Sequence, residues 1–206
     1  IIGAIANLAL NNYENGVVGV VALAENSVAG NAYKNDDIIK SLSGKTVEIT
    51  HTDAEGRLVL ADAITYIQKN YKVEKIIDLA TLTGDACVAL GESYSALFSN
   101  DEDLANDLVQ AGLKTFELTH KMPLHPDYEK AMKSSVADIK NSEAGAGAGS
   151  CTAASFLKFF VEKDVKWAHL DIAPVAFLNK EKFASIKGAT GYGVRLLTEF
   201  LYKIGK

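Results

Sequence analysis

Cysteine is scarce in this sequence, and basic residues are not in excess. Only two cysteines occur among the 206 residues, Cys87 and Cys151, and they lie far apart without paired spacing. This excludes a disulfide framework and a zinc ribbon, and we interpret both as small core residues of a protein from a reducing, cytoplasmic compartment. The formal net charge of −5 provides no basic surface for nucleic acid or an anionic membrane.

Several catalytic motifs are also missing. The four histidines form no H-E-x-x-H pattern, which excludes a zinc site of that kind. Neither a G-x-S-x-G nucleophile turn nor a Walker-type phosphate loop occurs. The apolar start, residues 1–10, lacks a basic leader and is too short to span a bilayer. We interpret it as a buried helix whose own beginning lies further upstream, so we expect the chain to be a fragment.

The hydrophobic pattern alternates between short apolar runs and longer helical periods, within a composition that is 48% hydrophobic and 23% charged. Strands are expected at residues 17–23, 45–50, 75–80, 95–99 and 167–173. Helices are expected at residues 58–69, 101–111, 151–162 and 193–204. Such alternation favours a three-layer α/β/α fold with a mixed, largely parallel sheet. Ligands of such folds usually bind at the ends of the strands.

Residues 143–150 form a glycine- and alanine-rich patch between two of these segments. Its glycines are typical of a loop, or of a backbone that closely approaches a ligand. A linker between two domains is the alternative. Because predicted helices flank the patch and the composition does not shift, we favour a loop within one domain.

The acidic stretch at residues 52–57, TDAEGR, lies between an expected strand and an expected helix. Asp53 and Glu55 are two positions apart, so in an extended backbone their carboxylates point to the same side. A nearby cation would relieve their repulsion, and Arg57 follows in the first helical turn. This combination suits metal-assisted hydrolysis, with ligands for metal ions and a donor for a developing oxyanion. A solvated turn with an incidental ion pair explains the same residues equally well.

A family resemblance changes this balance. The stretch HTDAEGRL at residues 51–58 resembles the signature NTDAEGRL of the leucyl aminopeptidase (cytosol aminopeptidase) family, from which it differs only at His51. Further blocks resemble the same family in the same order, so the resemblance covers essentially the whole chain. These blocks are ATLTG at 80–84, HLDIA at 169–173 and GATGYGVRLL at 188–197.

The resemblance implies roles for single residues. Asp53 would bind one metal ion and Glu55 would bridge two, the ions being manganese or zinc, or else magnesium. Arg57 would be the catalytic arginine that holds a bicarbonate-like anion. The substrate-binding positions implied are Thr81, Leu82 and Gly84.

The remaining metal ligands of the family, a lysine and two aspartates, lie upstream of the position that matches Ile1, and so does a second catalytic lysine. We therefore expect residues 1–206 to be the C-terminal portion of a single metallopeptidase catalytic domain and to be inactive alone. For His51 we expect a modest effect through hydrogen bonding, and a role as a further ligand is the less favoured alternative. His169 and Asp171 are interpreted as structural, and His120 and His125 as surface residues.

The function implied is a metal-dependent aminopeptidase that releases N-terminal residues such as Leu from peptides with a free N-terminus. The resemblance also implies a homohexamer. The alternative is a non-catalytic assembly or DNA-binding role on the same fold. The retained Asp53, Glu55 and Arg57 argue against it, as does the acidic net charge.

Overall fold

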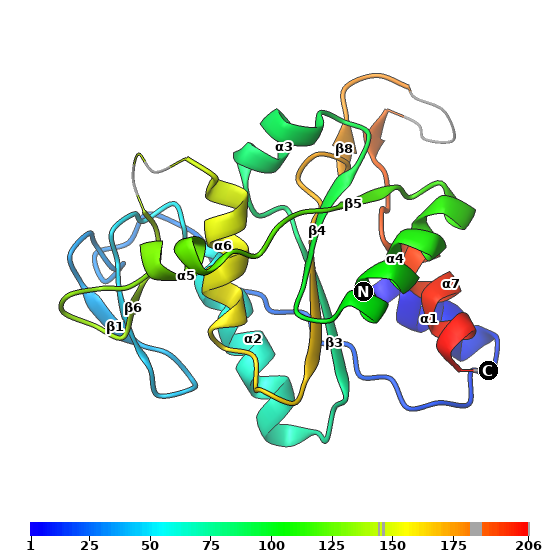
Figure 1. Ribbon diagram of the computed structural model, residues 1–206, viewed down its shortest axis with the longest axis horizontal. Coiled ribbons are helices and arrows are strands. Elements are labelled where there is room, and N and C mark those ends of the chain that lie inside the picture. The colour runs from blue at the N-terminus through cyan, green and yellow to red at the C-terminus, as the bar shows by residue number, and fades with distance from the viewer. Residues whose placement is uncertain (144, 146, 182–186, 206) are drawn as a thin grey trace.

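The computed structural model describes residues 1–143, 145, 147–181 and 187–205, which form a central sheet with helices on both faces (Figure 1). The order of strands across the sheet is β3 (Lys75–Ala80), β7 (Lys166–Asp171), β4 (Ser95–Ser99) and β5 (Thr119–Lys121). β3 pairs parallel with β7 and β4 with β5, whereas β4 and β7 are antiparallel. The expected mixed, largely parallel sheet is therefore confirmed.

Alternating side chains of β7 separate two apolar cores. Trp167 points into the first core, while Ala168 and Leu170 belong to the second. The first core is covered by α2 (Gly56–Asn70), α3 (Gly84–Leu90), α5 (Pro126–Ala131) and α6 (Gly149–Lys158). The second is covered by α1 (Ile2–Leu10), α4 (Glu102–Thr115) and α7 (Val194–Ile204). These are the three layers that the alternating pattern predicts.

A smaller sheet lies beside the first core. It consists of β1 (Ile38–Lys40), β2 (Thr46–Glu48) and β6 (Ile139–Lys140), with β2 antiparallel to β1 and parallel to β6. Val47 and Ile139 anchor this sheet in the first core. As expected for residues 45–50, β2 is buried at Val47 and only half-buried on either side. A two-stranded ribbon joins β8 (Phe177–Leu178) to β9 (Gly188–Ala189).

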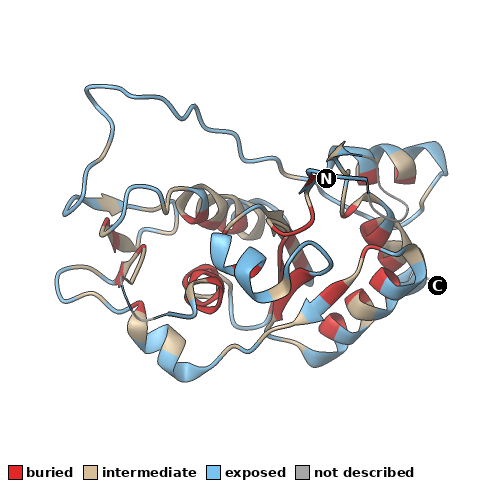
Figure 2. Cartoon of the chain, turned by 90° about the horizontal axis from the view of Figure 1, so that it is seen from above, coloured by how far each residue is buried: buried red, intermediate tan, exposed pale blue. Residues whose placement is uncertain are grey.

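One expectation for the N-terminal region is wrong, and a second is confirmed only in part. Residues 17–23, all of which the structure describes, join no strand ladder but form an extended, largely exposed thread (Figures 1 and 2). An apolar run becomes a strand only where a neighbouring strand takes up its backbone hydrogen bonds, and no described strand pairs with it here. The expected buried helix exists as α1, but only Ala4 and Leu8 are buried because one face alone packs against the molecule.

The glycine-rich patch lies only partly within the described residues, since 144 and 146 are outside them. On either side of it, Ile139 of β6 and Cys151 of α6 belong to the same apolar core. α6 begins at Gly149, two residues before the expected start, and ends at Lys158. No helix in the described part of the chain is long and apolar enough to cross a membrane.

Candidate active site

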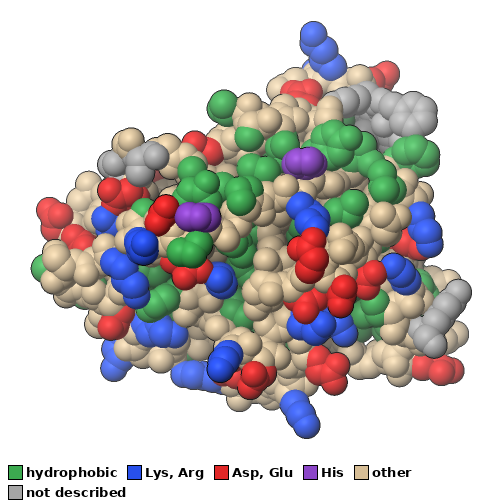
Figure 3. Space-filling model, in the orientation of Figure 1, with side chains coloured by type: hydrophobic (Ala, Val, Ile, Leu, Met, Phe, Trp, Pro, Cys, Tyr) green, Lys and Arg blue, Asp and Glu red, His purple; other side chains and the backbone are tan. Residues whose placement is uncertain are grey.

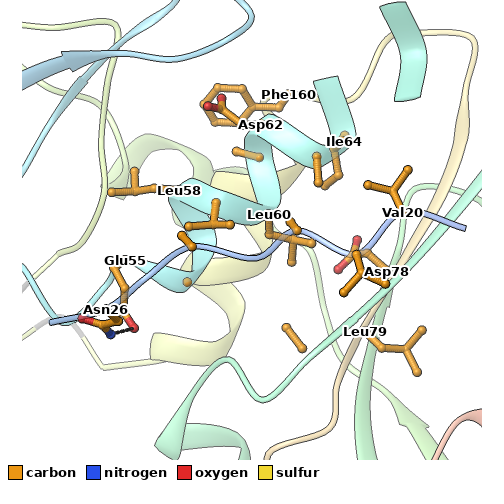
Figure 4. A pocket seen from close by; sticks show the side chains of 18 of the residues that line it. Val20, Asn26, Glu55, Leu58, Leu60, Asp62, Ile64, Asp78, Leu79 and Phe160 are labelled. Atoms are coloured by element: carbon orange, nitrogen blue, oxygen red, sulfur yellow. Dashed lines mark hydrogen bonds between the residues drawn. The ribbon is translucent and has the colours of Figure 1, made fainter. Parts of the chain in front are cut away.

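The acidic turn, residues 50–55, connects the end of β2 to the start of α2. Asp53 is exposed, and its backbone N–H donates to Nδ1 of His51 over 3.2 Å, so the imidazole closes the turn locally. Glu55 is half-buried at the position before α2, and its Oε1 accepts from Nδ2 of Asn26 over 3.4 Å (Figure 4). The Tyr33 hydroxyl donates to the carbonyl of Thr52 over 3.2 Å.

The two carboxylates offer the kind of ligand that hard divalent cations prefer. Two carboxylates are few for such a site. The described residues contain no group of three or more His, Cys, Asp or Glu that could hold a metal ion. The donor type of Asp53 and Glu55 therefore fits a divalent cation, whereas the donor count requires further ligands from another source.

Arg57 lies in the first turn of α2, and only 8% of its surface is exposed. Its Nη1 donates to the carbonyl of Asn141 over 2.7 Å, and its buried Nε has no partner within the described structure. Burial lowers the pKa of Arg57 to about 10, although the carboxylates of Asp171, Asp85 and Glu55 oppose the shift. The guanidinium therefore remains charged at neutral pH, with an unused donor that fits a small anion.

A cavity of about 320 Å³ adjoins the acidic turn. Asp53, Arg57, Leu82 and Gly84 all line it, so four of the residues expected at the site share one space. Glu55 instead lines a neighbouring groove of about 1240 Å³, which Asp53 also reaches. Figure 4 shows Glu55 at one end of this groove, with apolar side chains of α2 and β3 beyond it. Thr81, which was also expected at the site, is not among the described residues that line the cavity or the groove.

Asp171 holds the loop that follows β3. It is 1% exposed at the end of β7; Oδ1 accepts from the backbone N–H of Leu82 over 3.1 Å, and Oδ2 accepts from the Thr83 hydroxyl over 2.6 Å. Thr83 in turn accepts from the Ala86 amide and caps α3. The sequence analysis assigned Asp171 only a structural role. Its hydrogen bonds show that it supports the loop that forms one wall of the cavity.

Gly149, in the glycine-rich patch, lies so close to the Asp85 side chain that any larger residue there would require this side chain to move. A Cβ on Gly149 would lie 2.4 Å from Oδ2 of Asp85, which also lines the cavity. The close approach is thus to a carboxylate of the same chain.

The three histidines outside the acidic turn lie where the sequence predicts. His120 and His125 are exposed, as expected. His169 is buried, with Nδ1 bonded to Oδ1 of Asp78 over 2.5 Å.

Comparisons with known proteins agree on one family. The model of the cytosol aminopeptidase family, catalytic domain, matches residues 1–198. The probable cytosol aminopeptidase of Rickettsia typhi and the cytosol aminopeptidase of Rickettsia prowazekii are each 48% identical over 202 residues, which is 98% of this chain and 40% of those proteins. The chain thus spans about 40% of the length of the curated relatives it matches.

Solved structures agree with this assignment. A mutant of tomato leucine aminopeptidase superposes with a TM-score of 0.81 at 44% identity, covering 87% of this chain and 34% of that chain. The bottromycin maturation enzyme BotP superposes with the same TM-score of 0.81 at 37% identity, covering 85% of this chain and 39% of that one. By sequence and by fold, this chain belongs to the cytosol aminopeptidase family and matches its catalytic domain.

Proposed function

We propose that this chain supplies part of the active site of a metal-dependent aminopeptidase that releases N-terminal residues such as Leu from peptides. The observation that carries the proposal is the convergence of Asp53, Arg57, Leu82 and Gly84 on one cavity in a member of this family. Since the chain spans about 40% of its relatives, the activity is proposed for a longer polypeptide that contains residues 1–206 as the C-terminal portion of one catalytic domain.

In this proposal Asp53 would hold one divalent cation and Glu55 would serve two, with further ligands supplied by the rest of the polypeptide. Oxygen ligands suit manganese, zinc or magnesium. Bound cations of this kind polarise a peptide carbonyl and lower the pKa of a water. Because Asp53 is exposed and Glu55 is only half-buried, both carboxylates are accessible to ions and to a peptide.

Arg57 contributes a fixed positive charge beside these carboxylates. Its bond to the Asn141 carbonyl holds the guanidinium in place, and the unused Nε donor is suited to a bicarbonate-like anion. Arg57 would hold such an anion near the carboxylates, and the anion would supply a proton acceptor when bound. Backbone groups of Leu82 and Gly84 would line the peptide path, and Thr81 would lie near the first side chain.

The assembly and location of the enzyme belong to the same proposal. We infer a cytoplasmic homohexamer that acts on peptides with a free N-terminus, in keeping with the family and with the names of its relatives. Light scattering of the purified polypeptide tests the oligomeric state.

The decisive experiment replaces Glu55 by Ala in the complete polypeptide and measures hydrolysis of a leucyl amide with added manganese. We expect kcat/KM to fall by at least about 100-fold, because a residue that bridges two cations has no substitute nearby. Glu199→Ala is the matched control, since Glu199 forms a surface ion pair with Lys114 on the opposite side of the sheet. Wild-type activity in the Glu55 variant, with the control also active, would refute the two-cation mechanism.

A further inference from the structure

Asn141, which immediately follows β6, uses all of its polar groups on a single segment of the chain. It is fully buried, at 0% exposure. Its backbone N–H donates to the carbonyl of Glu48 over 2.9 Å, and its own carbonyl accepts Nη1 of Arg57 over 2.7 Å. Both main-chain groups therefore connect the end of β6 to residues that flank the acidic turn.

The side-chain amide of Asn141 spans the turn itself. Oδ1 accepts from the backbone N–H of Thr50 over 2.9 Å and from that of His51 over 3.3 Å. Nδ2 donates to the carbonyl of His51 over 2.7 Å and, more weakly, to that of Ala54 over 3.4 Å. The opposite amide orientation would place the Nδ2 donors against two N–H groups, so the surrounding backbone determines the orientation.

The Thr50 side chain strengthens the same junction. Its hydroxyl lies 3.2 Å from Oδ1 of Asn141 and 2.7 Å from the carbonyl of Ser142. Inside the turn, the backbone bond from Ala54 to the His51 carbonyl, 3.2 Å long, is one of few others present. The conformation of residues 50–54 thus depends largely on one side chain more than eighty residues away in the sequence.

The pairing of β2 with β6 does not depend on the side-chain amide of Asn141. At the other end of the β2–β6 pair, Oδ2 of Asp138 accepts from both the backbone N–H and the hydroxyl of Thr46, each over 2.8 Å. The strands are therefore connected without Asn141. What Asn141 adds is a fixed relation between the turn that carries Asp53 and the side chain of Arg57.

We propose that Asn141 is a positioning residue of the aminopeptidase site. It sets the backbone of the acidic turn, and through its own carbonyl it sets Arg57, so that carboxylates and guanidinium keep one relative placement. The inference rests on the function proposed above for Asp53, Glu55 and Arg57. Groups that orient metal ligands through hydrogen bonds typically contribute about 10- to 100-fold to metal affinity or activity.

The test uses Asn141→Leu in the complete polypeptide, which keeps the side-chain volume close to the original and removes the amide. We expect the manganese dissociation constant, measured by competition with a chelating dye, to rise by about 10- to 100-fold. We also expect hydrogen exchange at the amides of residues 50–54 to accelerate. Neither readout depends on turnover, and a purely structural role elsewhere in the sheet would leave both unchanged.

Asp138→Ala is the matched control, because it breaks two hydrogen bonds between the same strands without touching the turn. We expect it to lower the melting temperature while manganese affinity and exchange in residues 50–54 stay at wild-type values. Thr50→Val is a milder substitution, to be used if the Asn141→Leu protein does not fold. It should weaken manganese binding several-fold and in the same direction.

Three results would overturn the inference. Wild-type manganese affinity in the two turn variants is the first, and unchanged exchange in residues 50–54 is the second. The third is an equal loss of manganese affinity in Asp138→Ala, which would mean that any weakening of the small sheet lowers this affinity. A Glu55→Ala enzyme that remains active contradicts the proposed function instead, and the exchange measurement still decides whether Asn141 orders the turn.

Discussion

At the scale of single residues, buried polar side chains hold the loops that line the site. Asp171 accepts hydrogen bonds from the Leu82 amide and the Thr83 hydroxyl, and it also accepts from the Ala173 amide over 3.2 Å. A carboxylate that accepts several such bonds is costly to remove, because its donors remain buried without partners. The loop after β3 therefore depends on one residue of β7.

Replacing Asp171 by Ala should displace this loop and lower kcat/KM for leucyl amides by about 10- to 100-fold, since small displacements of substrate-lining groups have effects of that size. Steady-state kinetics of the complete polypeptide measure the change. Asp171→Asn keeps the shape and one acceptor, so we expect it to recover part of the loss. Asp107→Ala, on the surface of α4, should have wild-type kinetics. An Asp171→Ala enzyme with unchanged kcat/KM would contradict this role.

At the scale of elements, the start of α7 is fixed by a residue that lies before β5. Glu117 is buried, and its Oε2 accepts from the backbone N–H groups of Gly193, over 3.0 Å, and of Leu196, over 2.7 Å. Its Oε1 accepts from Nε of Arg195 over 3.1 Å. A carboxylate at a helix N-terminus satisfies free N–H groups and complements the helix dipole. Glu117 thus attaches α7 to the rest of its layer.

Glu117→Gln removes the charge and turns an amide donor toward groups that are themselves donors. We expect the free energy of unfolding to fall by about 2 kcal/mol. Urea titration followed by circular dichroism measures it. Glu199→Gln makes the same change on the surface of α7, where an exposed ion pair contributes less than about 1 kcal/mol. Equal losses in the two variants would show that the capping of α7 is not important.

At the scale of the whole molecule, one side of the fold carries a groove of about 1240 Å³, lined by apolar side chains and several carboxylates. Side chains of α2 and β3 line it together with the extended thread at residues 17–23, and Val20 lies along it (Figure 4). On the face seen in Figure 3, acidic and basic side chains are interspersed, so that face has no extended patch of one sign. The feature of the whole molecule that bears on the proposed function is that Asp53 and Glu55 line this groove.

The 206-residue chain by itself should bind manganese only in the millimolar range and should not hydrolyse leucyl amides. Two carboxylates are fewer ligands than a tight site for a divalent cation requires, and the described residues contain no larger cluster. Isothermal titration and an amidase assay, run beside the complete polypeptide, test this. Full activity of the isolated chain would show that no further ligands are needed.

Local sequence determined several elements of this fold. The strands at residues 75–80 and 95–99 have the expected bounds, because runs of that length with apolar side chains suit a buried strand. The α4 helix begins after Asp101, whose side chain accepts from the Leu104 amide, as an acidic first turn predicts. The position of Asp53 and Glu55 between a strand and a helix, and of Arg57 in the first turn of that helix, could be read from spacing and from the family signature.

Only the tertiary structure decided which residues support that site. Asn141 meets Arg57 across 84 positions of the chain, and Asp171 meets Leu82 across 89. No periodicity or motif marks such pairs, because a hydrogen bond between distant residues depends on where whole strands are placed. The same reason explains residues 17–23, where an apolar run indicates a strand but cannot provide its partner. Sequence thus determined the acidic turn with its carboxylates and the arginine that follows, and packing decided which distant side chains hold the turn in place.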